Sequence, residues 1–244
     1  MNKYADKISV VISEKDSGPA DAINKGFSKV SGEIMGWLNS DDKLHPQSLY
    51  AIAEIFQSLE KVEWIMGFPT WFKADGTCVN ESYYQPEKFY YSTRFISDNL
   101  HLKFARWSKW RFAMGDFNAI QQESVFWRKS LWDKAGRYIK SDTIAFDLEL
   151  WTRFFKYANL FTANVVLAGF RVHKNQISAV KRNEYRIESE KYVASFNKEL
   201  LGSSVISRLR INCAKLMKLF YYYEIPLLKN IYSYLLDDLL QTSL

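Results

Sequence analysis

The sequence contains little cysteine and no long apolar segment. Cys78 and Cys213 are its only cysteines and lie far apart, so we expect reduced thiols of a cytosolic protein, not a disulfide framework or a closely spaced metal site. No run of about 18 apolar residues occurs, and no basic segment precedes an apolar core near residue 1. We therefore expect neither a transmembrane helix nor a signal peptide. Internal repeats and low-complexity linkers are also absent.

The composition is that of a chain that buries a substantial core. Hydrophobic residues make up 48% of the 244 positions, and aromatic residues make up 16%. The net charge of +6 favours ligands that carry phosphate or an anionic membrane surface. Basic and aromatic residues alternate in His101–Phe112, but no nucleic-acid-binding motif accompanies them, so we expect no nucleic-acid partner.

Strand-like segments alternate with helix-like ones, which predicts an α/β fold with a mostly parallel sheet. The predicted strands are 7–13, 34–38, 64–68, 121–127 and 160–170, and the predicted helices are 20–31, 46–59, 129–135, 147–157 and about 182–199, 204–222 and 226–240. Because strand signals stop near residue 178, we predict an α/β domain at 1–178 and a helical extension at 179–244.

Two adjacent acids, Asp41 and Asp42, follow the apolar segment Ile34–Leu38. The carboxyl end of a parallel strand faces the crevice where α/β proteins bind ligands. Adjacent carboxylates repel each other and favour a hard divalent cation such as Mg²⁺ or Mn²⁺. A solvated turn before the next helix is the alternative for this pair.

The surrounding residues resemble the family 2 glycosyltransferases, over residues 7 to about 178. The matching positions are Glu14-x-Asp16-x-Gly18-x-Ala20-Asp21-Ala22-x-Asn24-x-Gly26, Gly32-Glu33-Ile34 and Trp37-Leu38-Asn39-Ser40-Asp41-Asp42. The resemblance implies a GT-A fold in which Asp42 binds the metal that bridges a diphosphate. It also implies a set of residues at the nucleotide sugar: Asp16, Gly18, Asp21, Asn24, Asn39, Asp41 and His173.

A second match, Phe146-Asp147-Leu148-Glu149-Leu150-Trp151-x-Arg153, resembles the family's acidic motif at a helix start. The resemblance implies that Asp147 is the general base, and the helix dipole favours the anion that a base requires. Simple capping of the helix is the alternative. We expect Arg153 to form an ordinary surface pair with Glu149.

Two further segments resemble parts of the family. Gln122-Glu123-Ser124-x-Phe126-Trp127-Arg128 is similar to an acceptor-side segment, where Glu123 and Trp127 would contact a sugar, and a structural role is the alternative. Phe170-Arg171-Val172-His173 is similar to a closing segment that brings His173 to the diphosphate, with surface or core placement as the alternative.

The resemblance begins late in the family pattern, so we expect the first strands of the fold and part of the nucleotide pocket to be missing, on the order of 50 residues. Without them, Ile34–Leu38 would lie at an edge of the sheet. The expected function is metal-dependent, inverting sugar transfer from a UDP-linked donor to a saccharide or lipid-linked saccharide acceptor, in cell-surface polysaccharide synthesis. The alternative is a truncated, non-catalytic remnant that binds a partner or a membrane surface. We expect a cytoplasmic protein, and the basic segment 205–220 leaves peripheral contact with the inner face of the membrane open.

Overall fold

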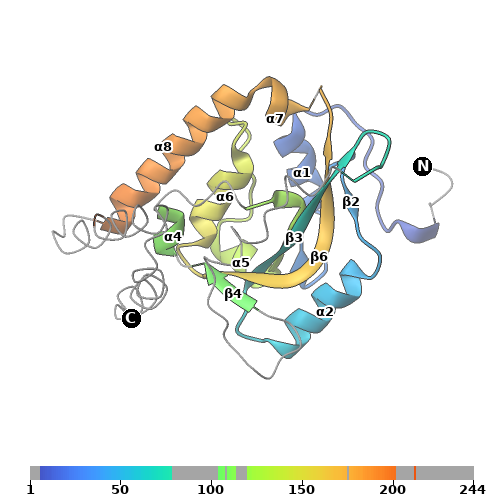
Figure 1. The fold of residues 1–244 in the computed structure, drawn as a ribbon, viewed down its shortest axis with the longest axis horizontal. Helices are drawn as coiled ribbons and strands as arrows, with labels where there is room; N and C mark the ends of the chain where they lie inside the picture. The colour runs from blue at the N-terminus through green and yellow to red at the C-terminus, as the bar shows by residue number, and fades with distance from the viewer. Residues whose placement is uncertain are drawn as a thin grey trace.

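The computed structural model describes residues 6–78, 104–107, 109–113, 120–174, 176–201 and 212. Its helices and strands alternate along the chain, as the sequence pattern predicts (Figure 1). The elements are α1 (Pro19–Phe27), β1 (Ile34–Met35), β2 (Lys43–Leu44), α2 (Ser48–Ser58), β3 (Trp64–Lys73), β4 (Phe104–Trp107), α4 (Lys109–Ala113), the 3₁₀ turn η4 (Gln122–Ser124), β5 (Val125–Arg128), α5 (Lys129–Lys134), α6 (Phe146–Phe154), β6 (Leu160–Val172), α7 (Ile177–Val180) and α8 (Arg182–Leu201).

The described strands form one sheet in the order β1-β5-β3-β6-β2, and β4 pairs with β6 outside this path. Only β3 and β6 pair in parallel, and the other pairs within the described residues are antiparallel. The expected α/β fold is confirmed, but its described sheet is mixed. The helical crossover from β1 to β3 does make these two strands point the same way. The sheet is mixed because β5 lies between them in the opposite direction, and because β2 and β4 run opposite to β6.

Strands β3 and β6 are long and curl together across the molecule (Figure 1). Their register shifts between Met66 and Pro69. Gly67 lies in this irregular stretch, and a Cβ there would be only 2.4 Å from Leu167 Cγ. A larger residue at position 67 would clash with the Leu167 side chain, which explains the glycine in this irregular stretch.

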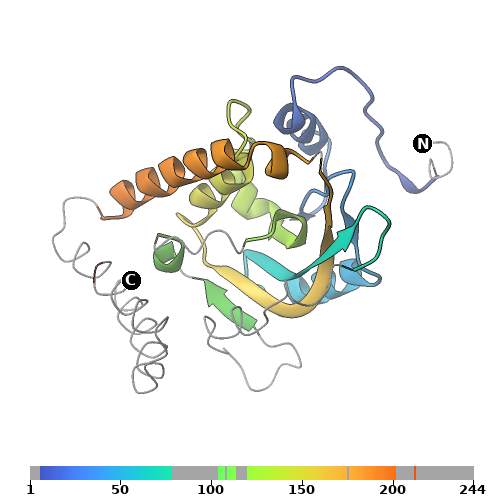
Figure 2. The ribbon, with the colours of Figure 1, turned by 45° about the horizontal axis from the view of Figure 1, so that its top comes forward.

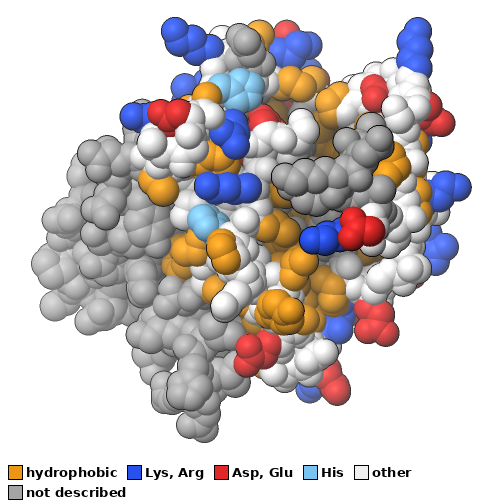
Figure 3. Space-filling view, turned by 90° about the vertical axis from the view of Figure 1, so that its right-hand side faces the viewer, with side chains coloured by type: hydrophobic (Ala, Val, Ile, Leu, Met, Phe, Trp, Pro, Cys, Tyr) orange, Lys and Arg blue, Asp and Glu red, His pale blue; other side chains and the backbone are white. Residues whose placement is uncertain are grey.

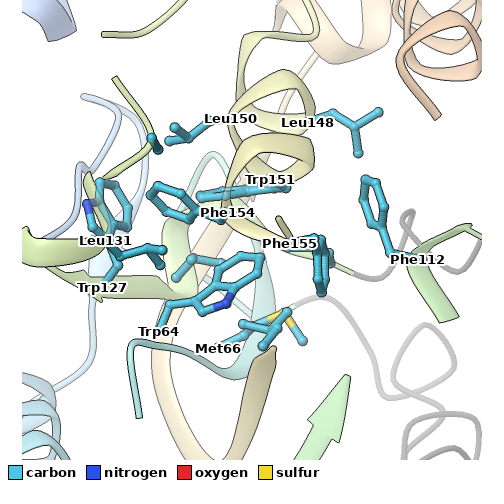
Figure 4. Packing of buried hydrophobic residues seen from close by; sticks show 14 of the residues in the cluster. Trp64, Met66, Phe112, Trp127, Leu131, Leu148, Leu150, Trp151, Phe154 and Phe155 are labelled. Carbon is cyan, nitrogen blue, oxygen red and sulfur yellow. The ribbon is translucent and has the colours of Figure 1, made fainter. Parts of the chain in front are cut away.

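Side chains of β3 alternate between two apolar cores, one on each face of the sheet. Trp64 and Met66 face a large aromatic cluster with Trp151, and Figure 4 shows Phe154 and Phe155 of the same region beside Trp64. Ile65 instead packs with α2 on the opposite face. Because successive side chains of a strand point to opposite faces, both faces of the sheet are apolar and both are covered by helices. These layers position the loops at the ends of the strands.

The segment Lys7–Ser13 forms no strand, so the prediction of a buried strand there is wrong. Val10 and Val11 are 52% and 51% exposed, and the segment runs outside the body of the molecule before α1 (Figure 2). A β-branched run needs a neighbouring strand to accept its backbone hydrogen bonds, and none of the described strands pairs with it. The prediction that Ile34–Leu38 would supply an edge strand is confirmed for its short strand β1, which is terminal in the described sheet.

Helix α8 confirms the predicted helix 182–199, and it completes the aromatic core. Val193 and Phe196 are buried in the same cluster as Trp151, and α8 packs along α6. The predicted helices at 204–222 and 226–240 lie outside the described residues, and the domain boundary near residue 178 stays a prediction. Among the residues that the structure describes, no helix is both long and apolar enough to cross a membrane.

Candidate functional site

The paired acids lie in a turn that follows β1. The Asp42 N–H donates to the Asn39 carbonyl at 3.1 Å and closes this turn. Asp42 is 9% exposed, and its carboxylate accepts hydrogen bonds from the Arg171 backbone N–H at 3.0 Å and from the Asn39 side-chain amide at 3.1 Å. Burial raises the pKa of Asp42, and these two hydrogen bonds oppose that rise. Asp42 is therefore held in a fixed orientation at the end of β6.

Asp41 turns toward the end of β6, where it meets His173. The distance from Asp41 Oδ2 to His173 Nε2 is 2.9 Å, and the two form an ion pair when the imidazole is protonated. The backbone N–H of His173 donates a hydrogen bond to the side-chain oxygen of Gln176 at 2.8 Å. The structure thus brings together two residues, 132 positions apart, that the sequence assigned to one ligand. Figure 3 shows histidine side chains beside basic and acidic ones on one face of the molecule.

Arg171 supports the acid turn, a role that sequence reasoning missed. Its Nε donates to the Asp41 carbonyl at 2.7 Å, and Nη1 donates to the Ala74 carbonyl at 2.7 Å. Its guanidinium also lies 4.6 Å from the centre of the Phe72 ring. Arg171 therefore ties the turn of Asp41 to the end of β3. The only signal in the sequence was its place two residues before His173.

Gln122 links the acid turn to the segment before β5. It accepts a hydrogen bond from Asn39 at 3.0 Å and donates one to the Trp37 carbonyl at 2.7 Å. These two contacts bring the segment that contains Glu123 to the acid turn, although the two segments are far apart in the sequence.

Glu123 is only 2% exposed, and its Oε1 finds no hydrogen-bond partner among the described residues. The pKa of Glu123 is raised to about 8, mainly by burial and to a smaller extent by the charges of Asp42 and Asp147. Glu123 therefore lies within electrostatic range of both predicted acids. Trp127 is fully buried among aromatic rings, including Trp151. These surroundings support the structural alternative for Trp127, while the acceptor role of Glu123 stays a prediction.

Asp147 lies in the first turn of α6 and is partly buried. Its Oδ1 accepts its neighbour's backbone N–H, from Leu148, at 2.8 Å. The Tyr185 hydroxyl of α8 lies 3.1 Å from each of the two carboxylate oxygens. Burial raises the pKa of Asp147, while these hydrogen bonds hold it down. A carboxylate with a raised pKa accepts a proton more readily, which suits a base.

The residues near α1 that the resemblance assigned to the nucleotide make hydrogen bonds within the protein, at the start of this helix and along it. Asp16 accepts the Gly18 N–H at 3.0 Å, and Asp21 accepts the Ser17 N–H at 2.9 Å. Gly18 has a φ of 134°, a conformation that glycine adopts without strain. The Asn24 amide both donates to and accepts from the Ile139 backbone at 2.7 Å. Asn24 thus fastens α1 to the loop before α6, and the ligand roles of these residues stay predictions.

The expected pair of Glu149 and Arg153 forms, but it is not an ordinary surface pair. Their side chains are 9% and 11% exposed, and they meet at 2.9 Å. Arg153 also donates to the carbonyls of Ala135 and Tyr138. The backbone of residues 135–138 covers the pair, so the pair is buried and connects α6 to the loop after α5.

The acid turn presents carboxylate oxygens, which are the donors that hard divalent cations prefer. The described residues contain no group of three or more His, Cys, Asp or Glu side chains arranged to hold an ion. Mg²⁺ and Mn²⁺ sites at nucleotides need fewer, because one or two carboxylates share the ion with substrate phosphates. Asp42, the residue that the resemblance assigned to the metal, is a donor of that kind. No specific ion is indicated by this arrangement.

The fold is that of a GT-A glycosyltransferase. It resembles S. aureus TarS 1–349 in complex with UDP-GlcNAc, with a TM-score of 0.55 at 12% identity, covering 95% of this chain and 64% of that chain. A second S. aureus TarS structure matches with a TM-score of 0.50 at 13% identity, over 90% of this chain and 35% of that chain.

The family follows from the sequence. The model for Glycosyl transferase family 2 matches residues 1–128, so the chain belongs to that family, as its motifs indicated. It is similar to uncharacterized glycosyltransferases of Rickettsia prowazekii (strain Madrid E) and Rickettsia typhi (strain ATCC VR-144 / Wilmington), at 23% and 24% identity. Each match covers 83% of this chain and 59% of the relative, so the chain spans less than two thirds of the length of these relatives.

Proposed function

We propose that the chain carries the active site of a metal-dependent, inverting glycosyltransferase that uses a nucleoside-diphosphate sugar, with UDP as the nucleotide. The observation that carries this proposal is the orientation of Asp42 by Arg171 and Asn39, beside the contact between Asp41 and His173. Membership of the family supports it, as does the presence of UDP-GlcNAc in the similar TarS structure.

In this proposal, Asp42 binds Mg²⁺ or Mn²⁺, with Asp41 on the ribose side of the nucleotide. The ion would neutralise the diphosphate and stabilise the charge that grows on it as it leaves. His173, once protonated, would add a positive group near the same phosphates. Its contact with Asp41 keeps the imidazole at the end of β6 until the ligand arrives.

Asp147 then acts as the base. The acceptor hydroxyl gives its proton to the Asp147 carboxylate while its oxygen bonds to the anomeric carbon. The bond from that carbon to the diphosphate oxygen breaks at the same time, and the bonding electrons leave with the nucleotide. A single displacement of this kind inverts the anomeric centre and needs no covalent intermediate.

The acceptor is proposed to be a saccharide or a lipid-linked saccharide, bound near Glu123, in cell-surface polysaccharide synthesis. A cytoplasmic location, with peripheral contact at the inner face of the membrane, belongs to the same proposal. The family supports the role in polysaccharide synthesis, and the basic segment 205–220 supports the membrane contact.

The test measures UDP binding by calorimetry in the presence of Mn²⁺, and then UDP release from UDP-sugars with saccharide acceptors. We expect Asp42→Asn to weaken UDP binding by about tenfold or more, and Asp147→Asn to bind UDP normally but lose at least about 100-fold in transfer. The exposed Asp142→Asn is the matched control.

The alternative is a non-catalytic remnant that binds a partner or a membrane surface. Binding of UDP without transfer to any acceptor would support the remnant. If UDP gives no heat with Mn²⁺, the nucleotide-sugar proposal is wrong altogether.

A further inference from the structure

Helix α8 follows the last strand of the described sheet, yet it reaches back to the predicted base. Tyr185 points its hydroxyl at Asp147, at 3.1 Å from both carboxylate oxygens. One turn further along α8, Glu188 accepts the backbone N–H groups of Ile144 and Ala145 at 2.9 and 3.2 Å, and also the Thr143 hydroxyl. Both contacts fall at the start of α6, where Asp147 lies.

The two residues share one face of α8 because they are three positions apart. The same face continues to Val193 and Phe196, which are buried in the aromatic core against α6. The Phe196 ring lies 5.4 Å from the Phe112 ring, centre to centre. The apolar end of α8 thus fixes its position along α6, so the polar end meets the start of α6 in one register.

Glu188 anchors the segment that leads into α6. The N-cap residue is Ala145, which has no side-chain oxygen to accept the unpaired N–H groups of the first turn. Glu188, from another helix, accepts the N–H groups of Ile144 and of Ala145 itself, and so fixes the position at which α6 begins. The hydrogen bonds from Thr143, Ala145 and Ile144 outweigh burial and lower the pKa of Glu188.

We propose that α8 is part of the catalytic machinery, with Tyr185 as the positioning residue that holds the Asp147 carboxylate toward the acceptor and Glu188 as the residue that anchors the start of its helix. This inference rests on the proposed function, in which Asp147 is the base. The positioning role of Tyr185 is its testable core.

The effect of Tyr185 on proton transfer has a definite sign. A hydroxyl donated to the ionised carboxylate lowers the pKa of Asp147, opposing the rise from burial. In the part of the chain that the structure describes, the other charged groups near Asp147 and the start of α6 are Glu123 from η4, Glu188 from α8, and Glu149 on its own helix, which is paired with Arg153. Removing the Tyr185 hydroxyl should therefore raise the pKa of Asp147, by about one unit.

The experiment follows the Asp147 side-chain carbon by ¹³C NMR across pH in the full chain, with the signal assigned by its loss in Asp147→Asn. We expect Tyr185→Phe to move the titration midpoint up by about one unit. Tyr192→Phe, on the same helix but beside Lys140, is the matched control and should leave it in place. In the transfer assay, the acidic limb of the kcat profile should move by the same amount.

A midpoint that is unchanged in Tyr185→Phe overturns the proposal. A midpoint that moves while the kcat profile stays in place supports the hold of Tyr185 on Asp147, and shows that the base role in the proposed function is wrong. If Tyr185→Phe does not fold, 3-fluorotyrosine placed at position 185 keeps the hydroxyl and makes it a stronger donor. It should move the midpoint downward, and no movement would overturn the proposal.

Discussion

Glu123→Gln should stabilise the protein, and by more as the pH rises. Glu123 is buried, and its pKa is raised from 4.5 to about 8, first by burial and then by Asp42 and Asp147. Between these two values the folded state holds a proton that the unfolded chain has released. Stability from this proton is fully present below pH 4.5 and is lost as the pH rises through about 8. Glutamine has nearly the same shape and never ionises, so it is spared this loss.

The magnitude follows from the shift in pKa. Each unit is worth about 1.4 kcal/mol, so the whole shift corresponds to at most about 5 kcal/mol of unfolding free energy. By pH 5.5 the wild type has lost about 1.4 kcal/mol of it, and by pH 8 about 4 to 5 kcal/mol. The advantage of Glu123→Gln should therefore grow by about 3 kcal/mol between these two conditions.

Urea unfolding of both proteins at pH 5.5, 7 and 8 measures this difference. Glu54→Gln, on the exposed face of α2, is the control and should follow the wild type at every pH. If the curves of wild type and Glu123→Gln stay parallel across the three conditions, Glu123 ionises as freely in the fold as in the unfolded chain. The burial argument for its role between Asp42 and Asp147 would then be refuted.

Two substitutions test the packing around the site. Gly67→Ala should destabilise the protein by about 1–3 kcal/mol in urea unfolding, because the new methyl group would meet Leu167 at 2.4 Å. Arg153→Met should cost about 3–5 kcal/mol in the same assay, because it leaves the buried Glu149 carboxylate without its ion partner.

Matched variants separate these effects from general sensitivity. Gly26→Ala, within α1 and with no atom within 4 Å of the new Cβ, should stabilise by about 0.5–1 kcal/mol, opposite in sign to Gly67→Ala. Arg137→Met breaks an exposed pair with Asp133 and should cost under about 1 kcal/mol. Equal losses in Arg137→Met and Arg153→Met would contradict the buried character assigned to the Arg153 pair.

The sequence predicted those parts of the fold that depend on local pattern. The apolar periodicity of α2 and α6 reports which face each helix buries, and both helices form within a few residues of their predicted bounds. Strand direction is different, because alternation of apolar residues is the same in parallel and antiparallel pairs. The place of β5 between β1 and β3 therefore could not be read from the sequence.

The residues of the candidate site also fall into those that the sequence predicted and those that it could not. The family motifs predicted that Asp41 and His173 serve one ligand, and the structure brings them into contact. Tyr185 and Arg171 act through contacts that no local pattern records. Tyr185 lies in a charged helix that carries no recognisable motif. Arg171 donates hydrogen bonds to backbone carbonyls, which any residue type can supply. Residues that orient a functional group from a distant segment can be identified only from the three-dimensional structure.

The carboxyl groups of Asp42, Asp147 and Glu123 are held in three different ways, and this difference affects the charge of the site. Asp42 receives a backbone N–H and an amide, and Asp147 receives a backbone N–H and the Tyr185 hydroxyl. Both therefore have donors that favour the anion. Glu123 Oε1 has no such partner among the described residues, and the pKa of Glu123 is about 8. Protonation of Glu123 thus relieves the repulsion that three anions would create. Its ionisation decides how much negative charge the site presents to a ligand that itself carries phosphate.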